Sequence, residues 1–291
     1  MRITQKIIHG EIQAELFKSM SRLQTISEEM ASGKRIRRPS DDPLQTVKAL
    51  SLRRNRDQFE AFLRNADDAL SWLRFSDSAL EGIENLISRA REIAIDQANA
   101  IYDQKIRANV AAEVRNILSQ MLNLANSSFN GRYIFAGSAT TSVPFSEEEG
   151  GFVYRGNSEE LLREIGPGDI VPVNAILSDK MVNVLNEIKG LEEALSENDV
   201  EGIRGKIGAL EDGLDRILEA RADVGARSAR VEMTKNFLLD QKTEMARLLS
   251  ETEDADIADV ITRFAQEQNA YRIALEVAAR IIQPSLIDFL R

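Results

Sequence analysis

The chain of 291 residues lacks cysteine altogether, and only 5% of its residues are aromatic, with a single tryptophan, Trp72. The absence of cysteine excludes disulfides, thiolate metal sites and cysteine catalysis. The shortage of aromatic residues favours helical bundles, in which Leu, Ile and Ala fill the contacts between helices, over a thick aromatic core. The net charge of −10 argues against a general nucleic-acid-binding protein, because binding phosphates requires a concentrated basic surface.

Reactive residues are also scarce. His9 is the only histidine, and the sequence contains no GxxxxGK[ST] phosphate loop, no GxGxxG dinucleotide motif and no nucleophile elbow. Adjacent acids such as Asp67 and Asp68 lie in polar helix starts and faces, where capping or solvation is the ordinary role of a carboxylate. The three acids at 147–149 lack the ordered ligand spacing of a cation site and are interpreted as a solvated loop. The sequence therefore predicts no enzyme, no cofactor and no metal site.

Long apolar runs are missing as well. No stretch approaches the ~20 apolar residues of a membrane span, and the first residues give no apolar run of the length that a cleaved signal peptide needs. We expect no membrane span, and we expect any export of the protein to use a route that reads no cleaved signal.

What the sequence does have is an apolar stripe at each end. Spacings that alternate between four and three place these side chains on one face of a helix. The N-terminal stripe, within 12–33, consists of Ile12, Leu16, Ser19, Leu23, Ile26 and Met30. The C-terminal stripe, within 254–291, consists of Ile257, Ile261, Phe264, Gln268, Tyr271, Leu275, Ala278 and Ile282. Neither stripe has a partner nearby in the sequence, so each must pack against the other or against another molecule. This pattern predicts an assembly protein.

The two ends also differ in charge. Residues 1–38 contain eight Lys or Arg and four acids, whereas residues 250–291 contain four Arg and eight acids. The resulting net charges of +4 and −4 are consistent with pairing of the two ends, although solvated helix faces would give a similar pattern.

Between the two stripes the pattern is mostly helical. Helices are expected over 4–32, 43–99, 103–129, 180–195 and 199–249, before the C-terminal helix. Gly33 suits the end of the first helix. Asp42 as a cap, Pro43 in the first turn and Gln45 three residues after the cap predict a sharp helix restart.

The helix over 199–249 carries an apolar side chain at every seventh residue. These side chains are Ile203, Leu210, Ile217, Val224, Val231, Leu238 and Met245. Glycines at 202, 205, 208, 213 and 225 are unexpected in such a helix, since each costs about 1 kcal/mol against alanine. They permit close helix approach or bending, or else the helix begins later than the period suggests.

The composition changes between 131 and 178, which hold three of the six prolines and seven of the sixteen glycines. Strands are expected over 133–135, 152–155, 161–165 and 169–173. Gly150 and Gly151 suit a turn between strands, and Pro172 belongs on a strand edge.

These elements predict a mainly α fold, in which a long antiparallel helical bundle or coiled coil is formed by the N- and C-terminal halves, with a small inserted β domain. The expected domains are a terminal coiled coil (1–42 with 252–291), a helical rod (43–130 with 179–251) and a β-rich outer insertion (131–178).

Six segments of the sequence resemble the flagellin superfamily. They are SGKRIRRPSDDP (32–43), NADDALSWL (65–73), RAREIAIDQANA (89–100), FNGRYIFAGS (129–138), TEDADIADVITRFAQEQNAYRIAL (252–275) and IIQPSLIDFL (281–290). They occur in the family's order and leave only the insertion and parts of 180–250 unmatched. The resemblance implies terminal helices that are largely disordered until assembly and then pair as a coiled coil in an inner tube, with the β insertion projecting outward.

Two kinds of family member compete, the filament subunit and the adaptor that joins the hook to the filament. Three features favour the adaptor: Pro39–Pro43 replaces an AKDDAAG-like segment of filament subunits, the ending reads Ile281–Leu286, and Gly131–Gly137 enters a short β insertion. The block Arg89–Asn99 is close to that of filament flagellin. Filament flagellin itself, and an intracellular coiled-coil scaffold, remain the alternatives.

For an adaptor, the resemblance implies a secreted structural protein at the distal end of the hook. The implied partners are further copies of the chain, flagellin, a hook-side junction protein, and a flagellar export chaperone that binds the C-terminal region; no nucleic acid is implied. The expected assembly interface is a packing interface. Its residues are Ile12, Leu16, Leu23, Ile26, Ile257, Ile261, Phe264, Tyr271, Leu275, Ile282, Leu286 and Phe289.

Overall fold

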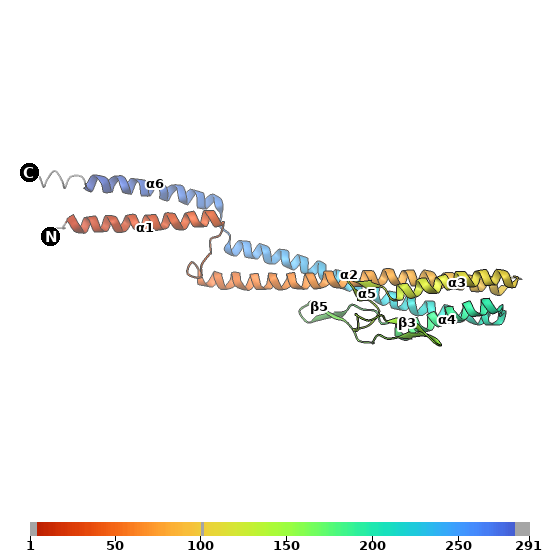
Figure 1. The fold of residues 1–291 in the computed structure, drawn as a ribbon. Helices are drawn as coiled ribbons and strands as arrows, with labels where there is room; N and C mark the ends of the chain where they lie inside the picture. The colour runs from red at the N-terminus through yellow and green to blue at the C-terminus, as the bar shows by residue number, and fades with distance from the viewer. Residues whose placement is uncertain (1–4, 100–101, 283–291) are drawn as a thin grey trace, which may run out of the picture. The chain divides into compact units, whose positions relative to one another are not determined.

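The computed structural model describes residues 5–99 and 102–282, and the chain is mainly helical there (Figure 1). Its helices are α1 (Gln5–Ser32), α2 (Pro43–Asn99), α3 (Gln104–Ala125), α4 (Ser178–Glu197), α5 (Val200–Glu253) and α6 (Ile257–Ile282). Its strands are β1 (Ser128–Phe129), β2 (Arg132–Tyr133), β3 (Phe145–Glu148), β4 (Gly151–Tyr154), β5 (Leu162–Gly166) and β6 (Asp169–Pro172). The prediction of a mainly helical chain with paired N- and C-terminal helices and a small β insertion is confirmed.

The described residues form two compact units. The terminal unit comprises the residues up to Asp57 and those from Lys242 onward, and the central unit comprises Gln58–Gln241. The β hairpins lie within the central unit. The finer division of the chain into three domains stays a prediction.

The predicted apolar stripes form the core of the central unit. On α5, the stripe residues Ile203, Leu210, Ile217, Val224, Val231 and Leu238 are all buried. On α2, the apolar residues Leu63, Ala66, Leu70, Leu73, Leu80 and Ile87 are buried as well. Charged side chains flank this contact, and Arg221 of α5 lies 3.0 Å from Asp77 and 2.8 Å from Glu84 of α2. The period of seven therefore predicted both α5 and the face that it buries.

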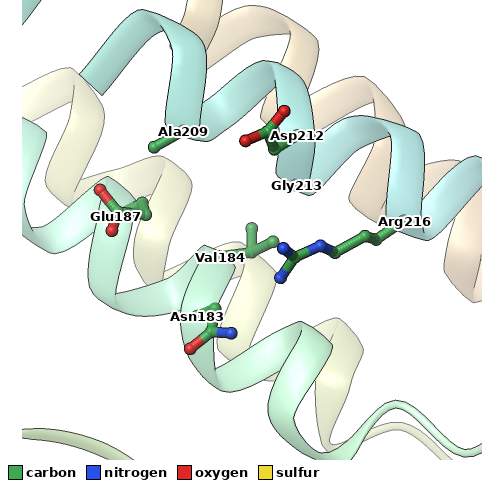
Figure 2. A pocket seen from close by; sticks show the side chains of 7 residues that line it. All are labelled: Asn183, Val184, Glu187, Ala209, Asp212, Gly213 and Arg216. Atoms are coloured by element: carbon green, nitrogen blue, oxygen red, sulfur yellow. The ribbon is translucent and has the colours of Figure 1, made fainter. Parts of the chain in front are cut away.

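The glycines of α5 serve the packing of α4 in part. A Cβ added at Gly213 would lie 2.8 Å from Cγ2 of Val184, and one at Gly202 would lie 3.3 Å from Cβ of Ala194. Figure 2 shows the groove between α4 and α5 beside Gly213, a space of about 210 Å³. Since α5 begins at Val200, the alternative that this helix starts later is wrong.

The other three glycines of α5, at 205, 208 and 225, face open space. Close helix approach therefore accounts for two of the five glycines, and nothing in the structure explains the rest.

Three two-stranded antiparallel hairpins occupy the described residues between α3 and α4. Asn130 and Gly131 have φ of 51° and 75° and form the turn between β1 and β2, as an Asn-Gly pair favours. The turn predicted at Gly150 and Gly151 is confirmed, since Gly150 lies between β3 and β4 and Gly151 begins β4, with φ of 115° and 137°.

Two strands were not expected from the sequence, because each carries too few apolar residues to be recognised. β1 replaces the predicted end of the third helix, so α3 ends at Ala125 rather than at 129. β3 contains Glu147 and Glu148, which were expected in a solvated loop. Their side chains are paired, Glu147 with Lys189 at 2.8 Å and Glu148 with Arg155.

The hairpins share their buried side chains with the helices. Ile134 and Phe135 are fully buried and belong to the same apolar cluster as Leu73 and Val224. Polar contacts add to this anchoring, since Asn126 exchanges two hydrogen bonds of 2.9 and 3.0 Å with the backbone of Phe145. The insertion is thus held to the central helices by a common core.

A pair of neighbouring residues tests this core. Ile217 is fully buried, whereas the next residue, Leu218, is 40% exposed. We expect Ile217→Ala to lower the free energy of unfolding by about 2–5 kcal/mol, because it leaves a cavity among close-packed side chains. Leu218→Ala is the matched control and should cost less than about 1 kcal/mol. Urea unfolding followed by circular dichroism measures both; equal losses would contradict the described packing.

Candidate assembly interface

In the terminal unit, α1 and α6 lie side by side and run antiparallel (Figure 1). Helix α1 ends where predicted, with Gly33 at φ 67° and its N–H donating to the carbonyl of Glu29 at 2.8 Å. The side chains buried between α1 and α6 are called the seam below.

On α1 the seam follows the predicted stripe. Ser19 is buried, and the stripe residues Ile12, Leu16, Leu23 and Ile26 are partly buried. Met30, the last residue of the stripe, is instead 38% exposed. Glu29 takes its place, because the carboxylate binds Arg263 of α6 at 3.0 Å.

On α6 the seam is only partly the predicted one. Phe264, Tyr271 and Ala278 are buried or partly buried, as expected. The positions between them differ from the prediction. Besides Arg263, the α6 residues with restricted exposure are Val260, Phe264, Glu267, Tyr271, Ala274 and Ala278. The spacing still alternates between four and three, so the helical period was right although half of the positions were not.

The residues that the sequence placed on the seam but the structure places outside it are apolar. Ile257, Ile261 and Leu275 are 43%, 52% and 44% exposed, and Gln268 is exposed. Two interleaved stripes share Phe264, Tyr271 and Ala278, and the stripe that faces α1 contains Glu267 in place of Ile257, Ile261 and Leu275. The Glu267 carboxylate in the stripe that faces α1 is hydrogen-bonded across the seam to Ser19 and Arg22.

The remaining predicted interface residues lie at the end of the chain. Ile282 is the last residue of α6, and its side chain is outside the described part. Leu286 and Phe289 lie outside the described residues altogether. Their role in assembly stays a prediction.

Charged side chains cross the seam at two levels. The Glu267 carboxylate accepts hydrogen bonds from the Ser19 hydroxyl at 2.8 Å and from Nε of Arg22 at 2.9 Å. One turn toward the start of α6, Arg263 donates to Glu29 at 3.0 Å and to Asp259 at 2.8 Å. Both acids are largely buried, with side-chain exposures of 19% for Glu267 and 13% for Glu29.

The segments that follow α1 and precede α6 also meet in the terminal unit. The N–H of Arg35 donates to the carbonyl of Glu253 at 2.7 Å, and the N–H of Ala255 donates to the carbonyl of Gly33 at 2.9 Å. The Glu253 side chain is 3% exposed and is paired with Lys34 and Arg53. We call this contact between 33–36 and 253–255 the joint. The joint could not be predicted from the sequence, because no local pattern distinguishes Glu253 from the exposed acids around it.

The restart after the joint is as predicted. Oδ1 of Asp42 accepts the N–H of Gln45 at 3.0 Å, which caps α2, and Pro43 is its first residue. Oδ2 of Asp41 accepts the N–H groups of Arg38 and Arg37 at 2.8 and 3.1 Å. These two bonds, the one from Arg38 first, hold the pKa of Asp41 below its usual value.

No reactive centre accompanies this interface in the described part of the chain. His9 is a half-buried residue of α1. Among residues 5–99 and 102–282, no group of His, Asp and Glu side chains could hold a metal ion. No helix within the same ranges combines the length and the apolar character that crossing a membrane requires. What the geometry offers is a surface for packing.

Comparison of the sequence with protein-family models identifies the helical regions at both ends of the chain. The family model of the bacterial flagellin N-terminal helical region matches residues 3–140, and that of the bacterial flagellin C-terminal helical region matches residues 207–290. The chain belongs to the flagellin family. The family models span α1 to the first hairpin and most of α5 and α6, and they leave β3–β6 and α4 unmatched.

Individual relatives within the flagellin family are of two kinds. Flagellar hook-associated protein 3 of Escherichia coli is 25% identical, with 93% of this chain and 93% of that protein covered. Flagellin FlaB1 of Treponema pallidum is also 25% identical, with 83% of this chain and 82% of that protein covered. The crystal structure of Bacillus cereus FlgL has a TM-score of 0.63 at 22% identity, covering 69% of this chain and 99% of that chain. The similarity to this crystal structure is evidence for the fold alone.

Both terminal helices of this flagellin-family chain leave apolar side chains uncovered. On α1, Phe17 is 75% exposed and Met20 is 55% exposed. Together with Gln13, Leu16 and Tyr271 they line an open groove of about 340 Å³. The exposed apolar residues of α6 are Ile257, Ile261, Ile273, Leu275 and Val277. Apolar side chains grouped in this way on a helix pair mark a surface that another molecule covers.

The pH dependence of the seam follows from Glu267. Its pKa lies below the ordinary 4.5, because the Ser19 hydroxyl and then Arg22 bind the carboxylate, against the opposing effect of partial burial. A depressed pKa in the folded state stabilises the seam above about pH 4.5, and this contribution is lost as the pH falls through the folded value. We expect the α1–α6 pairing to weaken as the pH drops below about 4.5.

Thermal melts followed by circular dichroism at a series of pH values measure this dependence. Glu267→Gln removes the titrating group and keeps the shape of the side chain, so the variant should lose less stability on acidification than the wild-type chain. Identical pH profiles for the two proteins would contradict the assignment.

Proposed function

We propose that this chain is a structural subunit of the bacterial flagellum that joins the hook to the flagellin filament, the role implied for an adaptor. The observation that carries the proposal is the relationship to flagellar hook-associated protein 3 over 93% of both chains. The three sequence features that separate adaptors from filament subunits favour the same position. The protein would then be secreted and would act at the distal end of the hook.

Two of these features lie in described parts of the structure. Pro39–Pro43 forms the restart between the joint and α2, which Asp42 caps. Gly131–Gly137 begins at the hairpin turn and continues into Ile134, Phe135 and Ala136, which are fully buried. The block thus fastens a short insertion to the helices, which is the feature by which it resembles adaptors.

Filament flagellin is the second candidate, and the relationship to flagellin FlaB1 of Treponema pallidum supports it. The two candidates differ in copy number and therefore in distribution along the flagellum. Immunolabelling of flagella in the source bacterium should place this chain in a narrow band between hook and filament. Labelling along the whole filament would instead establish the filament subunit and overturn the adaptor.

The exposed apolar side chains suggest how such a subunit assembles. A filament requires contacts between unlike faces, because contacts between like faces close into dimers and stop growth. In this proposal the seam packs α1 against α6, and Ile257, Ile261 and Leu275 pack against neighbouring subunits. If the helices order only when a neighbour is present, ordering and binding become one event, which prevents premature polymerisation.

The partners proposed for this surface are further copies of the chain, flagellin on one side and a hook-side junction protein on the other. Before assembly, an export chaperone would bind the C-terminal region, covering the apolar side chains that later contact the neighbours. The central unit would fold independently of these exchanges.

A substitution on the outer face of α6 tests the proposed contacts. Ile261 is 52% exposed, so Ile261→Asp should leave the thermal unfolding of the isolated chain within about 0.5 kcal/mol of wild type. Because a buried, unpaired carboxylate is strongly unfavourable, the variant should fail to attach filaments and flagellin should be released into the medium. Gln266→Asp introduces the same charge at another exposed position of α6 and should attach filaments normally. Normal attachment by Ile261→Asp would remove this residue from the interface.

A further inference from the structure

We infer that four charged side chains of the seam, Arg22, Glu29, Arg263 and Glu267, select a single register for the pairing of α1 with α6. The inference concerns how the two ends recognise each other, and it holds whichever position in the flagellum the chain occupies.

The apolar side chains of the seam are poorly suited to selecting a register. On both helices they recur at alternating spacings of four and three, so sliding one helix by seven residues again places apolar side chains opposite each other. Seven residues is also the smallest slip that keeps seam positions of the same type facing each other. Within the seam, specificity therefore has to come from side chains that do not repeat every seven residues.

The charged residues have this property. In the observed register Arg263 binds Glu29 at 3.0 Å, and Glu267 binds Ser19 and Arg22 at 2.8 and 2.9 Å. Both contacts join opposite charges or a charge to a hydroxyl donor. The two acids are shielded from solvent, which strengthens their interactions with charges across the seam.

If α6 is shifted along α1 by seven residues toward the start of α1, both attractive contacts are replaced by contacts between like charges. Arg263 then faces Arg22 in place of Glu29. Glu267 then faces Ile12 and Glu15 in place of Ser19 and Arg22. Two attractive contacts become two repulsions between like charges in one step.

A slip of seven residues in the other direction is also penalised. Glu267 then faces Ile26 and Glu29, again an acid against an acid. Arg263 faces position 36, which lies beyond the end of α1 at Ser32, and so loses its partner on the helix. Both neighbouring registers thus place a partly buried carboxylate against a like charge, which is a recognised way of excluding competing pairings.

The joint is the competing source of register, because it ties Gly33 to Ala255 and Arg35 to Glu253 at one end of the seam. The experiment therefore uses a chain whose charges favour the register shifted by seven residues toward the start of α1, while the joint is left intact. The double variant Glu15→Arg with Arg22→Glu makes both contacts of the first slipped register attractive, and it places an acid against Glu267 in the observed register. Its net charge is that of the wild-type chain.

Pulsed electron paramagnetic resonance between two nitroxide labels reports the register. The full-length chain has no cysteine, so cysteines introduced at the exposed, off-seam residues Ser21 and Ala279 carry the only labels. A slip of seven residues displaces one helix along the other by about 10 Å. We expect one distance in the wild-type chain and, in the double variant, a population displaced by this amount.

Two controls accompany the double variant. Exchanging the charges of exposed residues, Glu11→Lys with Lys18→Glu, also preserves net charge and should keep the wild-type distance. Reversing all four seam charges, Arg22→Glu, Glu29→Arg, Arg263→Glu and Glu267→Arg, restores opposite charges across the seam and should keep that distance too. Asp259→Asn is made with them, because Asp259 also binds Arg263 and would otherwise lie beside a like charge. The charge-reversal variant keeps the inference testable if the double variant does not pair at all. Recovery of the wild-type distance in the charge-reversal variant would still support the inference.

Three results would overturn it. A double variant that keeps the wild-type distance would show that the joint sets the register. A fourfold reversal that loses the distance would show that the charges do not act as complementary pairs. A wild-type chain with a broad distance distribution would mean that the free chain has no single register to select.

Discussion

The terminal unit depends on one constraint: α1 and α6 have apolar stripes that are buried only when the two ends of the chain meet. The contact from Ser19 to Glu267 spans 248 residues of sequence. Short-range interactions contribute little to either helix, because most helix stability in proteins comes from packing of the apolar face and not from intrinsic propensity. The seam, its charged contacts and the joint all follow from this long-range pairing, and the apolar side chains left over are those that a single partner helix cannot cover.

Much of this organisation is readable from the sequence because it repeats. The period of seven in α5 identified its buried face from Ile203 to Leu238, and the signals at Gly33, Asp42 and Gly150-Gly151 marked ends and turns correctly. Periodicity fails where two stripes overlap. On α6 the apolar residues Ile257 and Ile261 outweighed Glu267, although the carboxylate is the one that faces α1. A residue whose burial depends on a bond to a distant partner leaves no local trace, and Glu253 in the joint is hidden for the same reason.

The division between matched and unmatched sequence also has a physical basis. The family models match both ends and leave β3–β6 and α4 aside. Within the central unit these unmatched elements share a buried cluster with the matched helices, through residues such as Phe145 and Leu185. A core of this kind requires apolar volume and tolerates many ways of providing it. The termini, in contrast, must present a defined set of side chains to each other and, in the proposed function, to neighbouring subunits.

The distance between the two partners along the chain also determines when they can meet. Helix α1 is synthesised first and α6 last, so α1 waits for about 240 residues of synthesis, or roughly 10–50 s at ordinary elongation rates of about 5–20 residues per second. During that time its stripe has no partner within the same molecule. Throughout that interval Ser19 and Arg22 also lack the Glu267 carboxylate that they bind in the folded chain, so their polar groups remain with water until the end of synthesis.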